Sequence, residues 1–308
     1  MSCKIVSNFK YGIFQLAGIT FCVLGLTGLP HTVAAKEVTQ TFNGLTLNAN
    51  LEVSEGSDLS DPMVLILHGF LGHYGMEIIK ASQQALLNNG RSSLAMNLSL
   101  GIDDRNGFHD CDTPHRHLQD NALSEIQAWV DWLKRQGTSD IVLLAHSRGA
   151  NEAMVYTAVQ VDPAITHLVL LAPGVDDNKQ RFEDRYGPTF NDTLARMMQA
   201  KQEGRGDKLV DGVDFWYCPQ AEVTPDSFLS YYGNDSPFRQ INNNLTKLPV
   251  PTLVIFGNAD EVVVSGHKII EPLVDGKHLQ QVIVDGAGHF FLDFNIEEAM
   301  EAMLEFLR

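Results

Sequence analysis

The chain of 308 residues has a formal net charge of −16, with 44% hydrophobic and 19% charged residues. This composition is ordinary for a globular protein and supplies enough apolar side chains for a sizeable core. A protein that binds nucleic acid normally presents a basic patch, which displaces counterions from the phosphates. The sequence shows no such patch, so we do not expect a nucleic-acid partner.

The first 35 residues have the order of a secretory signal peptide. Lys4 and Lys10 precede a largely apolar run over residues 11–29, and small residues follow up to Ala35. This pattern predicts cleavage near Ala35 and export to the periplasm or the exterior. The alternative is an uncleaved membrane anchor, because the apolar run is almost long enough to span a bilayer.

Two of the four cysteines, Cys3 and Cys22, lie in this segment, which leaves Cys111 and Cys218 in the exported chain. An even pair of cysteines in an exported protein suggests a disulfide. The alternative is two unrelated free thiols.

Beyond residue 36, strand-like and helix-like segments alternate. Residues 38–42 and 45–53 alternate apolar and polar side chains around the turn Asn43-Gly44, which predicts an antiparallel hairpin. Further strands are expected at residues 63–67, 93–98, 141–145, 167–171, 252–256 and 281–284, and helices at 77–89, 120–136, 149–161, 266–273 and 296–307. Short apolar strands that alternate with helices predict an α/β fold, with a mostly parallel sheet covered on both faces.

The long interval between the strands at 167–171 and 252–256 breaks this rhythm. It contains a helical stretch at residues 189–202 and several aromatic side chains. A structureless loop of this length is unusual in a compact domain. We therefore expect a helical cap over about residues 174–248, inserted between two strands of the sheet.

The pentapeptide Ala145-His146-Ser147-Arg148-Gly149 lies between a predicted strand and a predicted helix. A serine there stands on a sharp turn that exposes its hydroxyl at the carboxyl edge of the sheet, and small residues at both ends let the backbone close. We interpret Ser147 as a nucleophile. The alternative is a serine that caps the helix.

A serine nucleophile needs a base, and the base needs an acid that orients it. His289 stands in a glycine-rich stretch after the last predicted strand, and Asp260 follows the strand before it. These two residues are the expected base and acid. Asp176 and Asp177 are the alternative acids, and the neighbouring Glu261 is expected to face elsewhere.

The stretch His68-Gly69-Phe70 ends an early strand. We expect the backbone N–H groups of Phe70 and Arg148 to form an oxyanion hole, in which one donor typically contributes about 3 kcal/mol to transition-state stabilisation. The alternative is a plain turn after the strand. The side chain of Arg148 is expected either to contact a polar substrate or to lie in a surface ion pair.

These four elements occur in the order His-Gly, small-x-Ser-x-Gly, Asp and His, each after a predicted strand. In this respect residues 36–308 resemble the α/β-hydrolase family. The resemblance implies an eight-stranded, mostly parallel sheet, a triad of Ser147, Asp260 and His289, and an oxyanion hole at Phe70 and Arg148. Ala145 departs mildly from the usual glycine, and the cap is the part that matches the family least.

The segment over residues 101–118 is rich in aspartate and histidine and contains Cys111. These side chains are possible metal ligands, but no second ligand motif accompanies them and a serine triad needs no metal. We therefore expect no metal or cofactor, and interpret the segment as an ordered loop beside the active site. A bond from Cys111 to Cys218 would tie this loop to the cap.

The expected reaction is hydrolysis of a small-molecule carboxylic ester through an acyl-enzyme on Ser147. Several alternatives remain open on the same fold. They are hydrolysis of an amide, thioester or carbon–carbon bond, acyl transfer to an alcohol, and a binding protein without catalytic activity. The sequence does not identify the natural substrate or the oligomeric state.

Overall fold

A computed structural model describes residues 35–175, 178–234, 236–239 and 241–308, without the side chain of Arg239. The predicted signal peptide therefore lies outside the described residues, except for Ala35, and so do Asp176 and Asp177. Within the described part of the chain, no helix is both long enough and apolar enough to cross a membrane.

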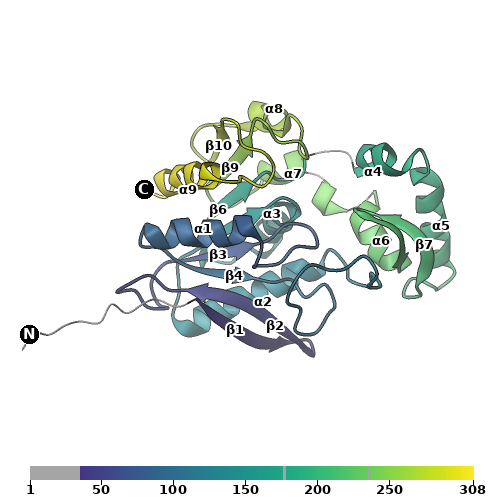
Figure 1. The fold of residues 1–308 in the computed structure, drawn as a ribbon, viewed down its shortest axis with the longest axis horizontal. Coiled ribbons are helices and arrows are strands. Elements are labelled where there is room, and N and C mark those ends of the chain that lie inside the picture. The colour runs from purple at the N-terminus through teal and green to yellow at the C-terminus, as the bar shows by residue number, and fades with distance from the viewer. Residues whose placement is uncertain (1–34, 176–177, 235, 240) are drawn as a thin grey trace, which may run out of the picture. The chain divides into compact units, whose positions relative to one another are not determined.

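An eight-stranded sheet, in the order β1-β2-β4-β3-β5-β6-β9-β10, forms the centre of residues 33–308 (Figure 1). Strands β1 and β2 pair antiparallel, as do β2 and β4, whereas the other neighbours are parallel. The strands are β1 (Lys36–Phe42), β2 (Leu45–Glu52), β3 (Met63–Leu67), β4 (Ser92–Met96), β5 (Ile141–His146), β6 (Ile165–Leu171), β9 (Thr252–Gly257) and β10 (Leu279–Val284). The predicted mostly parallel sheet of eight strands is confirmed.

Helices pack on both faces of this sheet because the side chains of its buried strands alternate between two apolar cores. Helices α2, α3 and α8 contribute to the core on one face, and α1 and α9 to the core on the other. Their bounds are α1 (Glu77–Asn88), α2 (Asn121–Gln136), α3 (Arg148–Gln160), α8 (Gly266–Ile270), continued by the 3-10 turn η2 (Glu271–Leu273), and α9 (Phe294–Phe306). This arrangement brings the ends of the parallel strands, and the loops that follow them, to one edge.

Between β6 and β9 the chain forms an insertion, here defined as residues 178–245. It consists of α4 (Asn178–Tyr186), α5 (Phe190–Gln202), β7 (Val210–Phe215), β8 (Cys218–Val223), α6 (Pro225–Tyr232), η1 (Pro237–Arg239) and α7 (Ile241–Leu245). The insertion has its own core, in which Phe182, Phe215 and Tyr232 are buried.

The segment expected to form a helical cap is helical only in part, because β7 and β8 form an antiparallel hairpin within it. Each of these strands has only six residues, and their pairing register shifts on both sides of Val213. Gly212 and Gln220 both have positive φ. These irregularities hide the period of two that would identify the strands in the sequence.

Candidate functional site

Ser147 lies at the junction between β5 and α3, as the sequence predicts. Its backbone has φ 53° and ψ −124°, a conformation that costs a non-glycine residue about 1–3 kcal/mol. The N–H of Ser147 donates to the carbonyl oxygen of Leu171 at 2.8 Å, which fixes the turn to the neighbouring strand β6. A Cβ at Gly149 would lie 2.1 Å from the carbonyl oxygen of His68, so only glycine fits there.

The side chains of Ser147, His289 and Asp260 form a hydrogen-bonded row. His289 Nε2 lies 2.9 Å from Ser147 Oγ, and His289 Nδ1 lies 2.9 Å from Asp260 Oδ2. The ionised carboxylate can only accept, so the imidazole hydrogen is on Nδ1 and Nε2 is free to accept the hydrogen of the serine hydroxyl. The structure therefore brings together the three residues that the sequence singled out, from positions up to 142 apart.

Asp260 is held as an ionised acceptor. Its Oδ1 accepts hydrogen bonds from the backbone N–H groups of Val262 at 2.7 Å and Val263 at 2.6 Å. Burial raises the pKa of this carboxyl, but hydrogen bonds from His289 and these backbone groups outweigh it and hold the pKa below its ordinary value. Glu261 does not bond the imidazole, although its Oε2 accepts from the backbone N–H of His289 at 3.4 Å.

The loops that present Asp260 and His289 are packed backbone against backbone. A Cβ at Gly257, the last residue of β9, would lie 2.0 Å from the carbonyl oxygen of Ala287. The side chain of Asn258 bridges the same loops, because it donates to Asp285 and accepts from the N–H of Gly286, both at 2.7 Å. The acid and the base are therefore positioned as one unit.

The expected oxyanion donors lie on either side of Ser147. Arg148 is the first residue of α3, so its N–H has no acceptor within the helix, and the helix dipole favours negative charge there. Gly69, which precedes Phe70, runs so close to the nucleophile that an added Cβ would lie 3.2 Å from the Cβ of Ser147. The backbone at Gly69 and Arg148 thus lies beside the serine, and the oxyanion hole at Phe70 and Arg148 stays a prediction.

His68 is a positioning residue that the sequence reasoning treated only as part of a motif. Its Nε2 accepts from the N–H of Leu98 at 3.1 Å and from Arg105 Nη2 at 3.2 Å, so Nδ1 carries the hydrogen and donates to the carbonyl of Gly69 at 2.7 Å. Burial and the Arg105 cation lower the pKa of His68 to about 3. Arg105 also donates to the carbonyl oxygens of Leu98 and Gly107. It therefore links the loop over residues 101–118 to His68, two residues before the expected oxyanion donor Phe70.

His146 is a second buried histidine that sequence reasoning passed over. Its Nε2 donates to the carbonyl oxygen of His289 at 2.9 Å, and its ring lies 4.9 Å from the His289 ring. Burial and the neighbouring His289 lower the pKa of His146 to about 3, which keeps it neutral. His146, which precedes Ser147, thus fixes the backbone of His289 through this hydrogen bond.

The side chain of Arg148 does not lie at the surface, as one of the two expectations for it required. It is 6% exposed, so it forms no surface ion pair. Instead its guanidinium carbon lies 4.1 Å from the ring centre of Trp216, and Nη2 donates to Asn178 Oδ1 at 3.1 Å. Burial lowers the pKa of Arg148 to about 10 and raises that of the neighbouring Glu152 to about 8. A single sequence cannot show this, because the contacts come from the insertion.

Aromatic side chains of the insertion also pack on the expected oxyanion residue. The ring of Phe70 lies 4.8 Å from that of Trp216 and 5.6 Å from that of Tyr231. A disulfide joins Cys111, in the loop over residues 101–118, to Cys218 at the start of β8. The insertion and this loop are therefore connected to each other and to the backbone beside Ser147.

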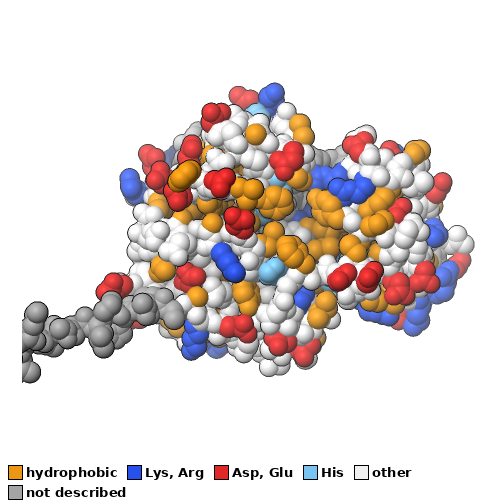
Figure 2. Space-filling view, in the orientation of Figure 1, with side chains coloured by type: hydrophobic (Ala, Val, Ile, Leu, Met, Phe, Trp, Pro, Cys, Tyr) orange, Lys and Arg blue, Asp and Glu red, His pale blue; other side chains and the backbone are white. Residues whose placement is uncertain are grey.

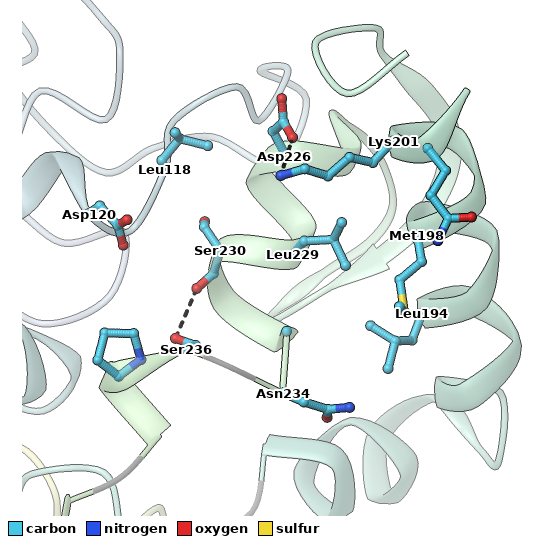
Figure 3. Close-up of a pocket in the computed structure, with 13 residues that line it drawn as sticks. Leu118, Asp120, Leu194, Met198, Lys201, Asp226, Leu229, Ser230, Asn234 and Ser236 are labelled. Atoms are coloured by element: carbon cyan, nitrogen blue, oxygen red, sulfur yellow. Dashed lines mark hydrogen bonds and ion pairs between the residues drawn. The ribbon is translucent and has the colours of Figure 1, made fainter. Parts of the chain in front are cut away.

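Two hollows lie near these elements. A hollow of about 280 Å³ is lined by His73, Met76, Phe108, Phe290 and Leu292, and Phe290 directly follows the expected base. A larger groove of about 680 Å³ lies between α5, α6 and the start of α2 (Figure 3). None of the three residues of the hydrogen-bonded row lines either hollow, but Phe290, which follows His289, lines the smaller one.

Hydrophobic side chains gather across the middle of one face of the molecule (Figure 2). Phe290 is 40% exposed, Leu292 49% and Phe108 64%. Because these three side chains line the smaller hollow beside His289, its wall is mainly apolar.

Comparison with known proteins agrees with this fold. The chain is similar over most of its length to solved structures that share its fold. Est1E from Butyrivibrio proteoclasticus, with ferulic acid bound, is 23% identical at a TM-score of 0.61, over 88% of this chain and 97% of that one. The Pyrococcus furiosus esterase Pf2001 is 19% identical at a TM-score of 0.55, over 90% of each chain. A search of curated protein sequences gives no match. The model of the alpha/beta hydrolase family matches residues 64–305. The chain therefore belongs to the alpha/beta hydrolase family.

Proposed function

We propose that this protein is a serine hydrolase that cleaves small carboxylic esters through an acyl-enzyme. The observation that carries the proposal is the row Ser147–His289–Asp260, with 2.9 Å at each step. Two of the similar solved structures are named esterases, and the proposal takes the class of reaction from them. That likeness, below 25% identity, supports the fold alone and gives no substrate.

In the proposed mechanism, His289 Nε2 takes the proton of Ser147 Oγ while the oxygen attacks the ester carbonyl. The negative charge that develops is stabilised by the N–H groups of Phe70 and Arg148. His289 then passes the proton to the leaving alcohol, and a water molecule repeats the sequence on the acyl-enzyme. Asp260 keeps the imidazole hydrogen on Nδ1 throughout. None of these steps uses a metal or a cofactor.

The hollow beside His289 indicates the chemistry of the substrate. Its wall contains two phenylalanines, a leucine and a methionine, which suit an apolar or aromatic group of the ester. The insertion packs against Phe70 and Arg148, so we propose that it acts as a cap that limits the size of the substrate.

Export remains a proposal based on residues 1–35. The disulfide between Cys111 and Cys218 supports it, since such bonds persist in oxidising compartments. Cleavage near Ala35 would leave the described domain intact, and N-terminal sequencing of the protein recovered from the periplasm or medium would test this.

The test of the function is hydrolysis of short and medium p-nitrophenyl esters by the purified protein, together with labelling by a fluorophosphonate. Loss of both in Ser147→Ala is expected. A folded wild-type protein that neither turns over nor labels would contradict the proposal and favour a binding protein. Labelling without ester turnover would move the activity to amides, thioesters or carbon–carbon bonds, and products joined to an added alcohol would indicate an acyltransferase.

A further inference from the structure

Three histidines of one loop, none of them part of the row at Ser147, meet in the interior. His109, His115 and His117 are 4%, 0% and 3% exposed. One ring nitrogen of each lies within 4.8 Å of a ring nitrogen of each of the others. The sequence shows them only as part of a polar segment, because the turn that brings them together is not visible in their spacing.

Most ring nitrogens of this cluster lack hydrogen-bond partners among the described residues. These nitrogens are His109 Nε2 and both Nδ1 and Nε2 of His115 and His117. A neutral imidazole has one donor and one acceptor, and buried groups of this kind are almost always paired. Three histidines that served only as core residues would be expected to find such partners. The arrangement therefore indicates a ligand that uses the nitrogens.

His109 is already oriented as a metal ligand. Its Nδ1 donates to the carbonyl oxygen of Asp110 at 3.0 Å, so Nε2 carries no hydrogen and has a free lone pair. Histidines that bind metals commonly donate their second nitrogen to a carbonyl or carboxylate in this way, which fixes the tautomer and the ring.

The surroundings hold the cluster in place. The N–H of His115 donates to the carbonyl of Glu222 at 2.8 Å, and its carbonyl accepts from the N–H of Thr224 at 3.0 Å. The ring of Phe215 lies 4.9 Å from that of His115, and the ring of Tyr231 lies 5.6 Å from that of His117. The disulfide of Cys111 ties the same loop to β8. The backbone is thus fixed, and the aromatic walls limit access of solvent.

We propose that His109, His115 and His117 bind one divalent transition-metal ion, for which zinc is the best fit, and that the ion fixes the loop over residues 101–118 against the insertion. Neutral imidazole ligands favour zinc, copper or nickel over magnesium or calcium. This replaces the expectation, based on the sequence, that the segment is only an ordered loop.

Binding requires small movements of the rings. Zinc–nitrogen bonds of about 2.0–2.1 Å in a tetrahedral site place the nitrogens roughly 3.3 Å apart, so the rings must draw closer. The rings of His109 and His115 lie at 16° to one another, and one of them must turn because a metal ion lies near the plane of each ring that binds it. The cavity of about 10 Å³ that His117 lines is close to the size of one water molecule, but His109 and His115 do not line it, so the fourth ligand would be a water molecule that enters with the ion.

The experiment uses the full-length protein without a polyhistidine tag, since a tag would bind the probe. The protein is treated with a chelator, incubated with Zn²⁺, separated from free metal and analysed for zinc. One zinc per chain is expected in the wild type, with a rise in Tm. Co²⁺ in place of Zn²⁺ should give the absorption bands of a four-coordinate nitrogen site.

His115→Phe and His109→Gln should each lose the zinc and the rise in Tm, whereas the control His267→Gln, on α8, should keep both. A wild-type protein that retains no zinc after separation would overturn the proposal, whatever the variants do. Unchanged zinc content in folded His109→Gln would also overturn it, since the metal would then be bound elsewhere. Neither result depends on the activity at Ser147.

Discussion

The guanidinium of Arg148 stacks on the ring of Trp216 at 4.1 Å, so the residue that follows the expected nucleophile carries a direct contact to the insertion. The backbone N–H of Arg148 is the proposed oxyanion donor, and its side chain contacts the insertion. A movement of the β7–β8 hairpin, which carries Trp216, would therefore displace the Arg148 side chain at the start of α3.

Arg148→Met should separate these two roles. The backbone N–H remains, but the stacking on Trp216 and the hydrogen bond to Asn178 are lost, and a hydrogen bond from a charged donor contributes about 1.5–3 kcal/mol. We expect a clear fall in the free energy of unfolding, measured by denaturant titration, while fluorophosphonate labelling of Ser147 persists. A variant as stable as the wild type would show that the cation does not support the insertion.

Asp260→Asn should lower kcat by about 10⁴-fold. The amide can keep its oxygen toward the N–H groups of Val262 and Val263, and its NH₂ group then faces His289 Nδ1. That nitrogen must become an acceptor, so the hydrogen moves to Nε2, where it blocks the acceptance of the serine proton. Steady-state kinetics on p-nitrophenyl esters measure the loss.

The matched control for this prediction is Glu261→Gln. Glu261 bonds only the backbone N–H of His289, so near wild-type kcat is expected. If Glu261→Gln were inactive and Asp260→Asn active, the acid would have to be reassigned.

The buried histidines should make the fold sensitive to mild acid. The pKa of His146 is about 3 in the folded chain against an ordinary 6.5, so the unfolded chain binds a proton first. The stabilising contribution is fully present above about pH 6.5 and is lost progressively as the pH falls toward 3. Each such residue lowers the free energy of unfolding by about 2 kcal/mol between pH 7 and pH 5.

In His146→Gln the amide NH₂ can still donate to the carbonyl of His289, but the group no longer titrates. Denaturant titrations at pH 7 and pH 5 should therefore show a pH dependence weaker by about 2 kcal/mol than in the wild type. Equal slopes in the wild type and His146→Gln would contradict the assignment of His146 as a buried neutral residue.

The disulfide closes a loop across 107 residues. In the chain-entropy view, a crosslink of that span stabilises the fold by up to about 5 kcal/mol. Cys111→Ala/Cys218→Ala should therefore lower Tm, and the wild type measured with a reductant should show a similar fall. If the reductant lowers the Tm of the double variant as well, its effect is not due to this bond. Mass spectrometry of unreduced peptides would identify the linkage directly.

Much of the fold was predictable because its signals are local. The run over residues 63–67 and the turn at Asn43-Gly44 specify a buried strand and a hairpin within a few residues. Ser147 and His289 stood out because glycines and small residues flank them in a way that sharp turns require. Asp260 followed from its place after a strand.

The parts that the sequence did not disclose depend on contacts between distant segments. The direction of the Arg148 side chain depends on Trp216 and Asn178. The tautomer of His68 depends on Arg105, which lies in a loop without a regular period. The hairpin β7–β8 is masked by its bulges. For Arg148 and His68 the determining partner lies far away along the chain, whereas the hairpin is hidden by its own irregular register.

The close approach of Gly149 to the carbonyl of His68 has a consequence for the energetics of the reaction. Two backbone segments in direct contact cannot shift independently, so the separation between Ser147 and the strand that leads to Phe70 is set when the protein folds. In the proposed reaction, the polar groups around the carbonyl then need little reorientation as charge develops. The free energy needed to orient them is supplied by folding, whereas water molecules would have to reorient during the reaction itself.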